Sequence, residues 1–320
     1  MTRCRVSVGH AARSHPRRSW PPWPFRLPPA FATNPWGANY FPNVSLTTQD
    51  GATVRFYDDL LKGKSVAINL VYTRCKDECP LETARLVQVQ RLLGSRVGKD
   101  IFFYSISIDP GHDTPEVLKG YAEKFGVGPG WLFLTGREAD VKVVAKKLGL
   151  SRRNDAANRD GHQPILMIGD EPTGRWMRNS AVDSPKFLAT TIGNFMGSKD
   201  PQPVRSSTEV AQLRAPDAGT YVFQSRCSAC HTIGKGDTVG PDLAGVTARR
   251  DRGWLVRYLR APDRMLAEND PIAVSLVAKY KNVPMPNLRL TEGEIAVVIA
   301  FLEARSGPRN DEGADSAARR

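Results

Sequence analysis

The chain changes its hydrophobic pattern once, near residue 198, and this change limits the folds that it can adopt. Before this point, short apolar runs alternate with segments whose apolar residues recur every three or four positions. Strands that alternate with helices in this way predict an α/β sheet. After this point only helical patterns occur, so we expect a second, small, all-helical domain. At 320 residues, the chain is long enough for two domains.

The predicted organisation has five parts, which differ in pattern and composition. They are a basic N-terminal segment (1–32), an α/β domain (33–197), a linker rich in proline and polar residues (198–214), an all-α domain (215–305) and a polar tail (306–320). Strands are expected over residues 66–72, 101–109 and 131–136 and as a hairpin over 164–180, and helices over 81–93, 114–126, 138–150, 184–196, 217–228, 252–260, 270–280 and 291–304.

The charge of the chain says little about its partners. The formal net charge is +12, and residues 1–32 alone contain six arginines and no acid. No stripe of interleaved aromatic and basic residues accompanies this charge, so we expect no nucleic-acid partner. An acidic protein or an anionic membrane face would fit it equally well. The N-terminal segment ends in Ala30-Phe31-Ala32, as a secretory signal does, but it lacks the apolar middle of such a signal.

The positions of the cysteines indicate a chemical role rather than a role in structural disulfide bonds. Four of the five lie in two close pairs, Cys75/Cys79 and Cys227/Cys230, and the fifth, Cys4, lies in the basic N-terminal segment. A small disulfide-stabilised domain would scatter its cysteines along the chain. Each pair is therefore a candidate for metal, cofactor or redox chemistry.

The second pair belongs to the sequence Cys227-Ser-Ala-Cys230-His231, a C-x-x-C-H motif typical of covalent haem attachment. Two cysteines three residues apart on one helical turn can both reach the porphyrin vinyl groups, and the next residue is then placed to bind the iron. A zinc site would need further cysteine or histidine ligands, and residues 198–320 contain none. We therefore expect haem c, with His231 as the proximal ligand of the iron.

The segment 215–305 resembles a small class I cytochrome c. The shared features are the C-x-x-C-H motif, Gly240-Pro241-Asp242-Leu243, a Met-Pro loop and a closing helix with the sequence LTEGEIAVVIAFLE. Met285, in the sequence NVPMPNL, matches the axial methionine of that pattern, whereas the other candidate, Met265, does not. The resemblance implies His/Met ligation, which raises the haem potential and suits electron transfer.

The first pair, Cys75 and Cys79, lies in the sequence YTRCKDECP at a predicted strand-to-helix turn, and its chemistry stays open on residues alone. The two thiols can form a disulfide or bind one soft ion together. Structural zinc needs four protein ligands, whereas copper(I) is satisfied by two or three, and His162 can reach this turn from a neighbouring strand. A thiol–disulfide exchanger usually carries C-x-x-C, and a peroxiredoxin needs a threonine three residues before its cysteine, where Thr73 is only two before Cys75.

Residues 33–197 resemble the SCO/SenC family of copper-binding, thioredoxin-like proteins. The matching features are the C-x-x-x-C-P turn, the segment SISIDPGHDTPEVLKGYAEKFG and a histidine before the last hairpin. The resemblance implies that Cys75, Cys79 and His162 bind copper for delivery to the copper-A centre of cytochrome c oxidase. It assigns no ligand role to His112, which we expect in a loop. Asp160-Gly161 precedes His162, where the family usually has Val-Asp.

Together the two resemblances predict a thioredoxin-like α/β domain followed by a small all-α cytochrome c domain, located in the periplasm or at the outer face of the inner membrane. One haem and one copper ion each exchange a single electron, so we expect the haem to exchange electrons with the copper site or with a redox partner protein. The alternatives are a thiol–disulfide oxidoreductase that uses Cys75 and Cys79, and a plain electron carrier that docks on a respiratory oxidase.

Overall fold

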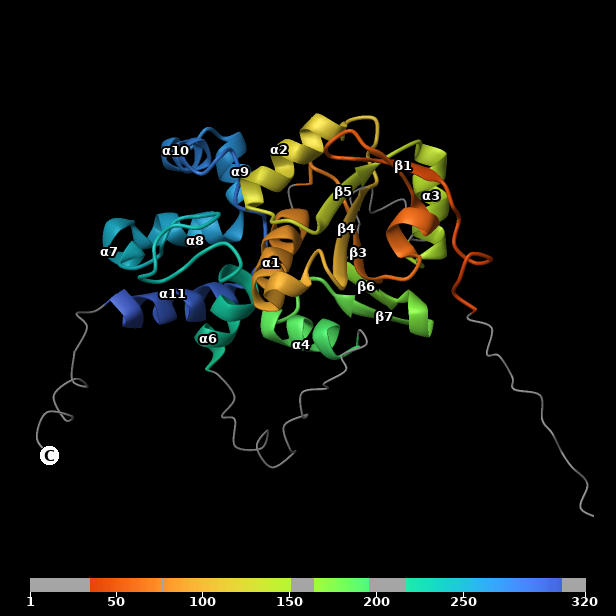
Figure 1. Ribbon diagram of the computed structural model, residues 1–320. Helices are drawn as coiled ribbons and strands as arrows, with labels where there is room; N and C mark the ends of the chain where they lie inside the picture. Colours follow the sequence, from red (N-terminus) through yellow and green to blue (C-terminus); the bar gives the residue numbers. More distant parts are fainter. Residues whose placement is uncertain (1–34, 76–77, 151–163, 196–216, 307–320) are drawn as a thin grey trace, which may run out of the picture. The chain divides into compact units, whose positions relative to one another are not determined.

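The computed structural model describes residues 35–75, 78–150, 164–195 and 217–306 (Figure 1). The expected basic segment 1–32, the linker 198–214, His162 and nearly all of the tail from 306 lie outside the described residues, so the expectations about them remain predictions. The α/β part and the helical part are described one after the other.

Within the described residues, seven strands form one mixed sheet. Their order across the sheet is β2 (Thr53–Arg55), β1 (Ser45–Thr48), β5 (Trp131–Thr135), β4 (Ile101–Ser107), β3 (Ser65–Val71), β6 (Ile165–Asp170) and β7 (Arg175–Ser180). The central strands β3, β4 and β5 are parallel, and β6 runs antiparallel to both β3 and β7. A βαβ unit joined to a ββα unit around β3 is the thioredoxin-like arrangement, which confirms the predicted fold class.

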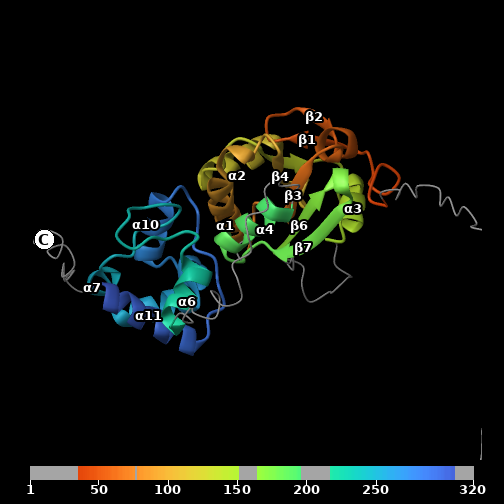
Figure 2. The same cartoon turned by 60° about the horizontal axis from the view of Figure 1, so that its bottom comes forward.

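Strand β3 is buried on both faces, and its side chains divide between two hydrophobic cores. Val66, Ile68 and Leu70 pack on one face with residues of α3 (Glu138–Lys147). Ala67 and Val71 pack on the other face, and there the covering helices are α1 (Glu78–Leu93), α2 (Pro115–Phe125) and α4 (Pro185–Phe195). Figure 2 shows α1, α2 and α4 on one side of the sheet and α3 on the other.

The ends of α2 agree with the sequence pattern. Thr114 is the N-cap, and its side chain accepts a hydrogen bond from the Val117 amide at 3.4 Å. Pro115 occupies the first helical position, and Gly126 ends the helix with a left-handed φ of 69°. An N-cap of this kind stabilises a helix by about 1 kcal/mol.

Helix α1 begins earlier than predicted. We expected this helix over residues 81–93, but it starts at Glu78, so that Cys79 and Pro80 lie inside its first turn. Proline is tolerated there because the first four amides of a helix have no partner within it. Strands β1 and β2 and a short helical segment over Phe56–Leu61 were not predicted, because three or four residues are too few for a periodic signal.

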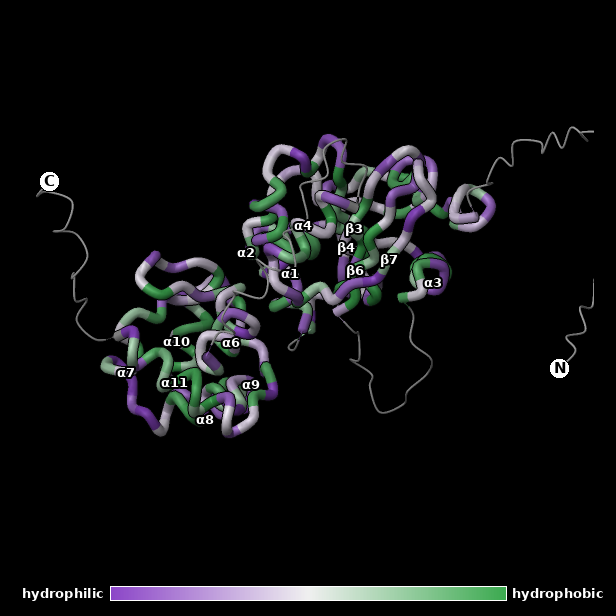
Figure 3. Tube along the Cα trace, turned by 90° about the horizontal axis from the view of Figure 1, so that it is seen from below, coloured by the Kyte–Doolittle hydropathy of each residue, from purple (hydrophilic) through white to green (hydrophobic). Residues whose placement is uncertain are grey.

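The C-terminal part is all helical, as predicted. Its helices are α6 (Ala218–Val222), α7 (Val246–Arg249), α8 (Arg252–Arg260), α9 (Pro262–Ala267), α10 (Pro271–Lys279) and α11 (Glu292–Ser306). Thr291 and Glu294 form a capping box at the start of α11, with reciprocal hydrogen bonds of 2.8 and 3.2 Å. Figure 3 shows α10 and α11 as largely hydrophobic segments. The core of this domain gathers α11 residues such as Ile295, Val298 and Ile299.

Two details of this domain differ from the prediction. The expected helix over 217–228 is divided into α6 and a π-helical segment over Phe223–Cys227, which leads directly into the C-x-x-C-H motif. Single π-helical turns are rare and occur frequently at functional sites. Helices α7 and α9 were not predicted, because they have only 4 and 6 residues.

No helix in the described ranges is both long enough and apolar enough to cross a lipid bilayer.

Candidate functional site

The first cysteine pair lies where β3 leads into α1, at the carboxyl end of the parallel strands. Ligand and cofactor sites of open α/β sheets occur preferentially at this edge. Residues Tyr72 to Cys75 form a tight turn, closed by the Cys75 amide, which donates to the Tyr72 carbonyl at 3.1 Å. Cys75 is 7% exposed and Cys79 is fully buried.

The two cysteines face each other across the first turn of α1. The Cys79 amide donates a hydrogen bond to the Cys75 sulfur at 3.5 Å. A donated N–H favours negative charge on that sulfur, as does the positive end of the α1 dipole. The Cys79 thiol, in contrast, favours its neutral form, because burial and then the neighbouring Cys75 raise its pKa well above the ordinary value. The pair is therefore chemically asymmetric.

The third predicted ligand, His162, lies outside the described residues. The register of the sheet nevertheless shows where the chain enters β6, since Ser65 pairs with Asp170 and Ile68 pairs with Met167. The first residues of β6 are therefore at the end of β3 from which the cysteine turn departs. That His162 reaches this turn stays a prediction. Among the described residues, no group of three or more histidine, cysteine or acidic side chains is arranged to hold a metal ion.

His112, which we expected in a loop, is exposed there, and its amide donates to the Asp109 carbonyl at 3.0 Å.

A row of buried polar side chains, which the sequence analysis missed, runs across the sheet from β5 to α1, the helix that carries Cys79. The Trp131 indole donates to the Ser105 hydroxyl at 2.9 Å, and Ser105 donates to the Asn69 side-chain oxygen at 2.7 Å. The Asn69 amide then donates to the Glu82 carboxylate at 3.0 Å. Glu82 is fully buried, one turn after Cys79, and burial raises its pKa well above the ordinary value, although the bond from Asn69 opposes the shift. The sequence signal that could have predicted this row is the presence of polar residues within the apolar runs of the strands.

The second cysteine pair forms a single turn at the end of the π-helical segment. The amides of Cys230 and His231 both donate to the Cys227 carbonyl, at 3.1 and 3.0 Å. Burial raises the pKa of each cysteine thiol to about 12. The turn thus brings Cys227, Cys230 and His231 together, in the order that the haem-attachment motif requires.

The ring of His231 is oriented for metal binding. Its Nδ1 lies 2.9 Å from the Pro241 carbonyl oxygen, so the neutral ring donates from Nδ1 and leaves Nε2 as an acceptor. Burial lowers the pKa of His231 and favours this neutral form. Metal-bound histidines usually have such a carbonyl partner. A Cβ on Gly240 would lie 2.5 Å from the Cε1 atom of His231, so only glycine leaves room for the ring.

The residues around His231 fit a haem. Within the helical domain they line a mainly apolar cavity, with contributions from Cys230, Tyr258, Leu276, Val283 and Met285. Met285 thus lies on the same cavity as His231, as expected of a second axial ligand. The other candidate, Met265, is 7% exposed and packs in the hydrophobic core instead.

Two family models match the chain. The SCO1/SenC model matches residues 36–169, and the cytochrome c model matches residues 216–306. The boundary between the two matches falls where the sequence pattern changes.

Individual proteins also resemble the α/β part. An SCO2-like protein of Rickettsia conorii is 36% identical over 147 residues, which are 43% of this chain and 69% of that protein. An SCO2-like protein of Rickettsia prowazekii is 31% identical over 134 residues, 40% of this chain, and the match spans 63% of that relative's length. The structure of Bradyrhizobium japonicum ScoI with copper bound has 27% identity and a TM-score of 0.39, covering 48% of this chain and 96% of that chain.

Replacing Glu82 by glutamine tests the effect of its burial on stability. Because the pKa of Glu82 is raised in the native state, folding favours the protonated form. The free energy of unfolding should therefore fall as the pH rises from about 4.3, the ordinary value, through the raised native pKa. Glu82→Gln should remove this decline, as measured by urea unfolding of the α/β domain between pH 4 and pH 9. An unchanged pH dependence would contradict the assignment, and Glu123→Gln on the exposed face of α2 is the control.

Replacing Gly240 by alanine tests the space around His231. The added methyl group meets the imidazole ring, which the Pro241 carbonyl holds in place, so Gly240→Ala should displace the ring from its binding orientation. After export with c-type haem maturation, the variant should show a smaller low-spin haem fraction in its absorption spectrum. Gly293→Ala, which meets no atom within 4 Å, should keep the wild-type spectrum. Equal spectra for all three proteins would be the contrary result.

Proposed function

The chain belongs to the SCO1/SenC family and ends in a cytochrome c domain, and from this premise we propose that it binds copper and delivers it to the copper-A centre of cytochrome c oxidase. Cys75, Cys79 and His162 would hold the copper. The observation that carries this proposal is the hydrogen bond from the Cys79 amide to the Cys75 sulfur, because it brings the Cys75 sulfur against the first turn of α1, which carries Cys79. Thiolates select copper(I) over harder ions.

The C-terminal domain would hold a covalently attached haem c. Cys227 and Cys230 would form the thioether bonds, while His231 and Met285 would bind the iron. The support is the fixed His231 ring, the room left by Gly240 and the position of Met285 on the same cavity. A haem bound in this way supplies one-electron transfer.

The electron count supports a link between the two sites. Reduction of one Cu(II) to Cu(I) consumes one electron, which is what oxidation of one ferrous haem releases, whereas reduction of a disulfide consumes two. The haem domain would therefore exchange single electrons with the copper bound at Cys75 and Cys79, or with a redox partner protein. Attachment of haem c takes place outside the cytoplasm, so the working protein would be periplasmic or at the outer face of the inner membrane.

A second candidate function, thiol–disulfide exchange, is favoured by the asymmetry of the cysteine pair. Cys75 accepts an amide hydrogen bond at a helix N-terminus, as a nucleophilic cysteine does, and burial raises the pKa of Cys79. Copper binding separates the two functions.

Copper and haem should be measured on one sample of exported, haem-matured protein that is titrated with Cu(I). We expect one tightly bound copper per haem. His162→Ala should weaken binding by at least about tenfold, or about 1.4 kcal/mol, because one of three ligands is lost. His112→Ala, which removes the exposed loop histidine, is the matched control and should bind as the wild type does.

Binding no tighter than that of a free dithiol, and equal in all three proteins, would contradict copper delivery and favour thiol–disulfide exchange.

A further inference from the structure

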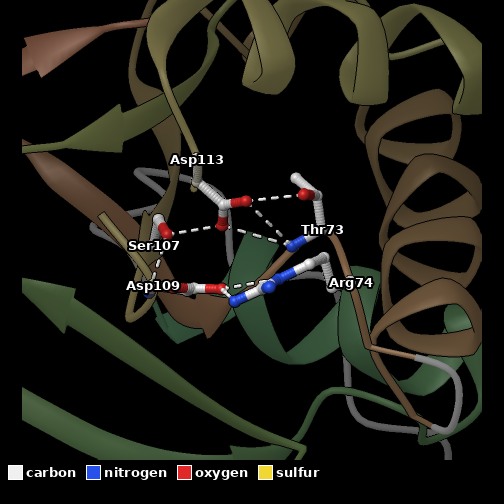
Figure 4. Close-up of polar contacts among 5 residues, drawn as sticks. All are labelled: Thr73, Arg74, Ser107, Asp109 and Asp113. Atoms are coloured by element: carbon white, nitrogen blue, oxygen red, sulfur yellow. Dashed lines mark hydrogen bonds and ion pairs between the residues drawn. The ribbon is translucent and has the colours of Figure 1, made fainter. Parts of the chain in front are cut away.

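A buried carboxylate, Asp113, connects the cysteine turn to the neighbouring strand β4 (Figure 4). Its Oδ1 accepts the Thr73 hydroxyl at 2.5 Å, and its Oδ2 accepts the Thr73 amide at 3.2 Å. Oδ2 also accepts the hydroxyl of Ser107, the last residue of β4, at 2.6 Å. All three partners, two hydroxyl groups and one amide, donate to the two carboxylate oxygens of Asp113.

The position of Asp113 makes this connection strong. Its side chain is fully buried, and so is Ser107. Leaving a buried polar group without its hydrogen-bond partner is costly, so these hydrogen bonds hold the turn firmly. Asp113 itself is held by its own amide, which donates to the Asp109 carbonyl at 2.9 Å, and it directly precedes the N-cap of α2. The carboxylate is therefore anchored on its own side as well.

The group held by Asp113 is the main chain of the cysteine turn. Thr73 is the second residue of the turn that the Cys75 amide closes onto the Tyr72 carbonyl. Fixing the Thr73 amide and hydroxyl together sets the path of the chain two residues before Cys75. The direction in which the Cys75 sulfur points, toward the Cys79 amide, depends on that path.

A second connection between the same two loops lies on the surface. Arg74 pairs with Asp109 at 2.5 Å, with side chains that are 62% and 27% exposed. Figure 4 shows this pair beside the Asp113 contacts. Exposed ion pairs contribute little to holding a geometry, because solvent screens them. The buried connection through Asp113 is thus the one that determines the position of the turn.

We propose that Asp113 is a positioning residue for the cysteine pair: it holds Thr73 against the end of β4 and thereby keeps Cys75 facing Cys79 in the arrangement that binds copper. This inference rests on the proposed copper-binding function. Asp113 touches neither sulfur in this account and acts only through the main chain of the turn.

The test compares Asp113→Asn with a matched control, Asp170→Asn, in the full-length, haem-matured protein. Asp170 is also a buried carboxylate, 3% exposed, and it accepts the Ser65 hydroxyl at 2.7 Å and the Thr173 hydroxyl. Ser65 starts β3, so Asp170 accepts hydroxyl hydrogen bonds as Asp113 does, but at the end of that strand opposite to the cysteine turn. The amide of either variant cannot accept from all the former donors.

Asp113→Asn should weaken Cu(I) binding by roughly 10- to 100-fold, the usual effect of losing a group that orients metal ligands. It should also speed the alkylation of Cys75 by iodoacetamide in the copper-free protein, because the turn is released. Asp170→Asn should leave both quantities at wild-type values even where it lowers stability. Thr73→Val should show the Asp113→Asn effects in weaker form, and Thr73→Ser, which keeps the hydroxyl, should restore the wild-type values.

Wild-type copper affinity and alkylation rate in both Asp113→Asn and Thr73→Val would overturn the inference while leaving the proposed function intact. Equal losses in Asp113→Asn and Asp170→Asn would also overturn it, because the effect would then be one of general stability. If the wild type binds no copper, the proposed function fails, and the alkylation rates still decide whether Asp113 positions Cys75.

Discussion

The burial of β3 on both faces is the constraint on which the α/β domain depends. Because its side chains alternate between two cores, a shift of β3 by one residue would move every side chain into the opposite core and disrupt the packing of both. Its end is therefore fixed at Val71, and the turn that carries Cys75 starts at a defined place. Pairing with β4 then brings Ser107 beside Val71, so that Asp113 can reach both the end of β4 and the turn. Packing sets the position of the turn, and a buried carboxylate sets its shape.

In the helical domain, too, local structure positions the reactive side chains. A π-helical segment brings Cys227 into position, and the turn that follows aligns Cys230 and His231 on one carbonyl. The ring of His231 is then oriented by the Pro241 carbonyl and accommodated by Gly240. In both domains a short turn after regular structure carries the reactive side chains. Asp113 holds the main chain of one turn, and the Pro241 carbonyl orients the His231 ring of the other. This orientation in advance lowers the cost of binding a metal.

Much of this structure is predictable from the sequence, and there are physical reasons why the remainder is not. The cap of α2 at Thr114 and the capping box at Thr291 depend on local hydrogen bonds, so short sequence motifs predict them. The start of α1 could not be predicted in this way, because the first turn of a helix is too short to show a periodic hydrophobic pattern. The candidate ligands could be named from motif spacing and family resemblance. Their buried support, Asp113 and Glu82, could not, because it depends on contacts between residues 40 and 13 positions apart.

Stopped-flow mixing can show whether the haem and the copper site of one chain exchange electrons. Protein with reduced haem and no copper is mixed with one equivalent of Cu(II), and the haem absorbance is followed. We expect stoichiometric oxidation of the haem, at a rate independent of protein concentration once copper is bound. This phase should be lost when Cys75 and Cys79 are both replaced by serine. A haem spectrum that does not change on adding Cu(II), or that changes equally in the serine variant, would contradict this expectation.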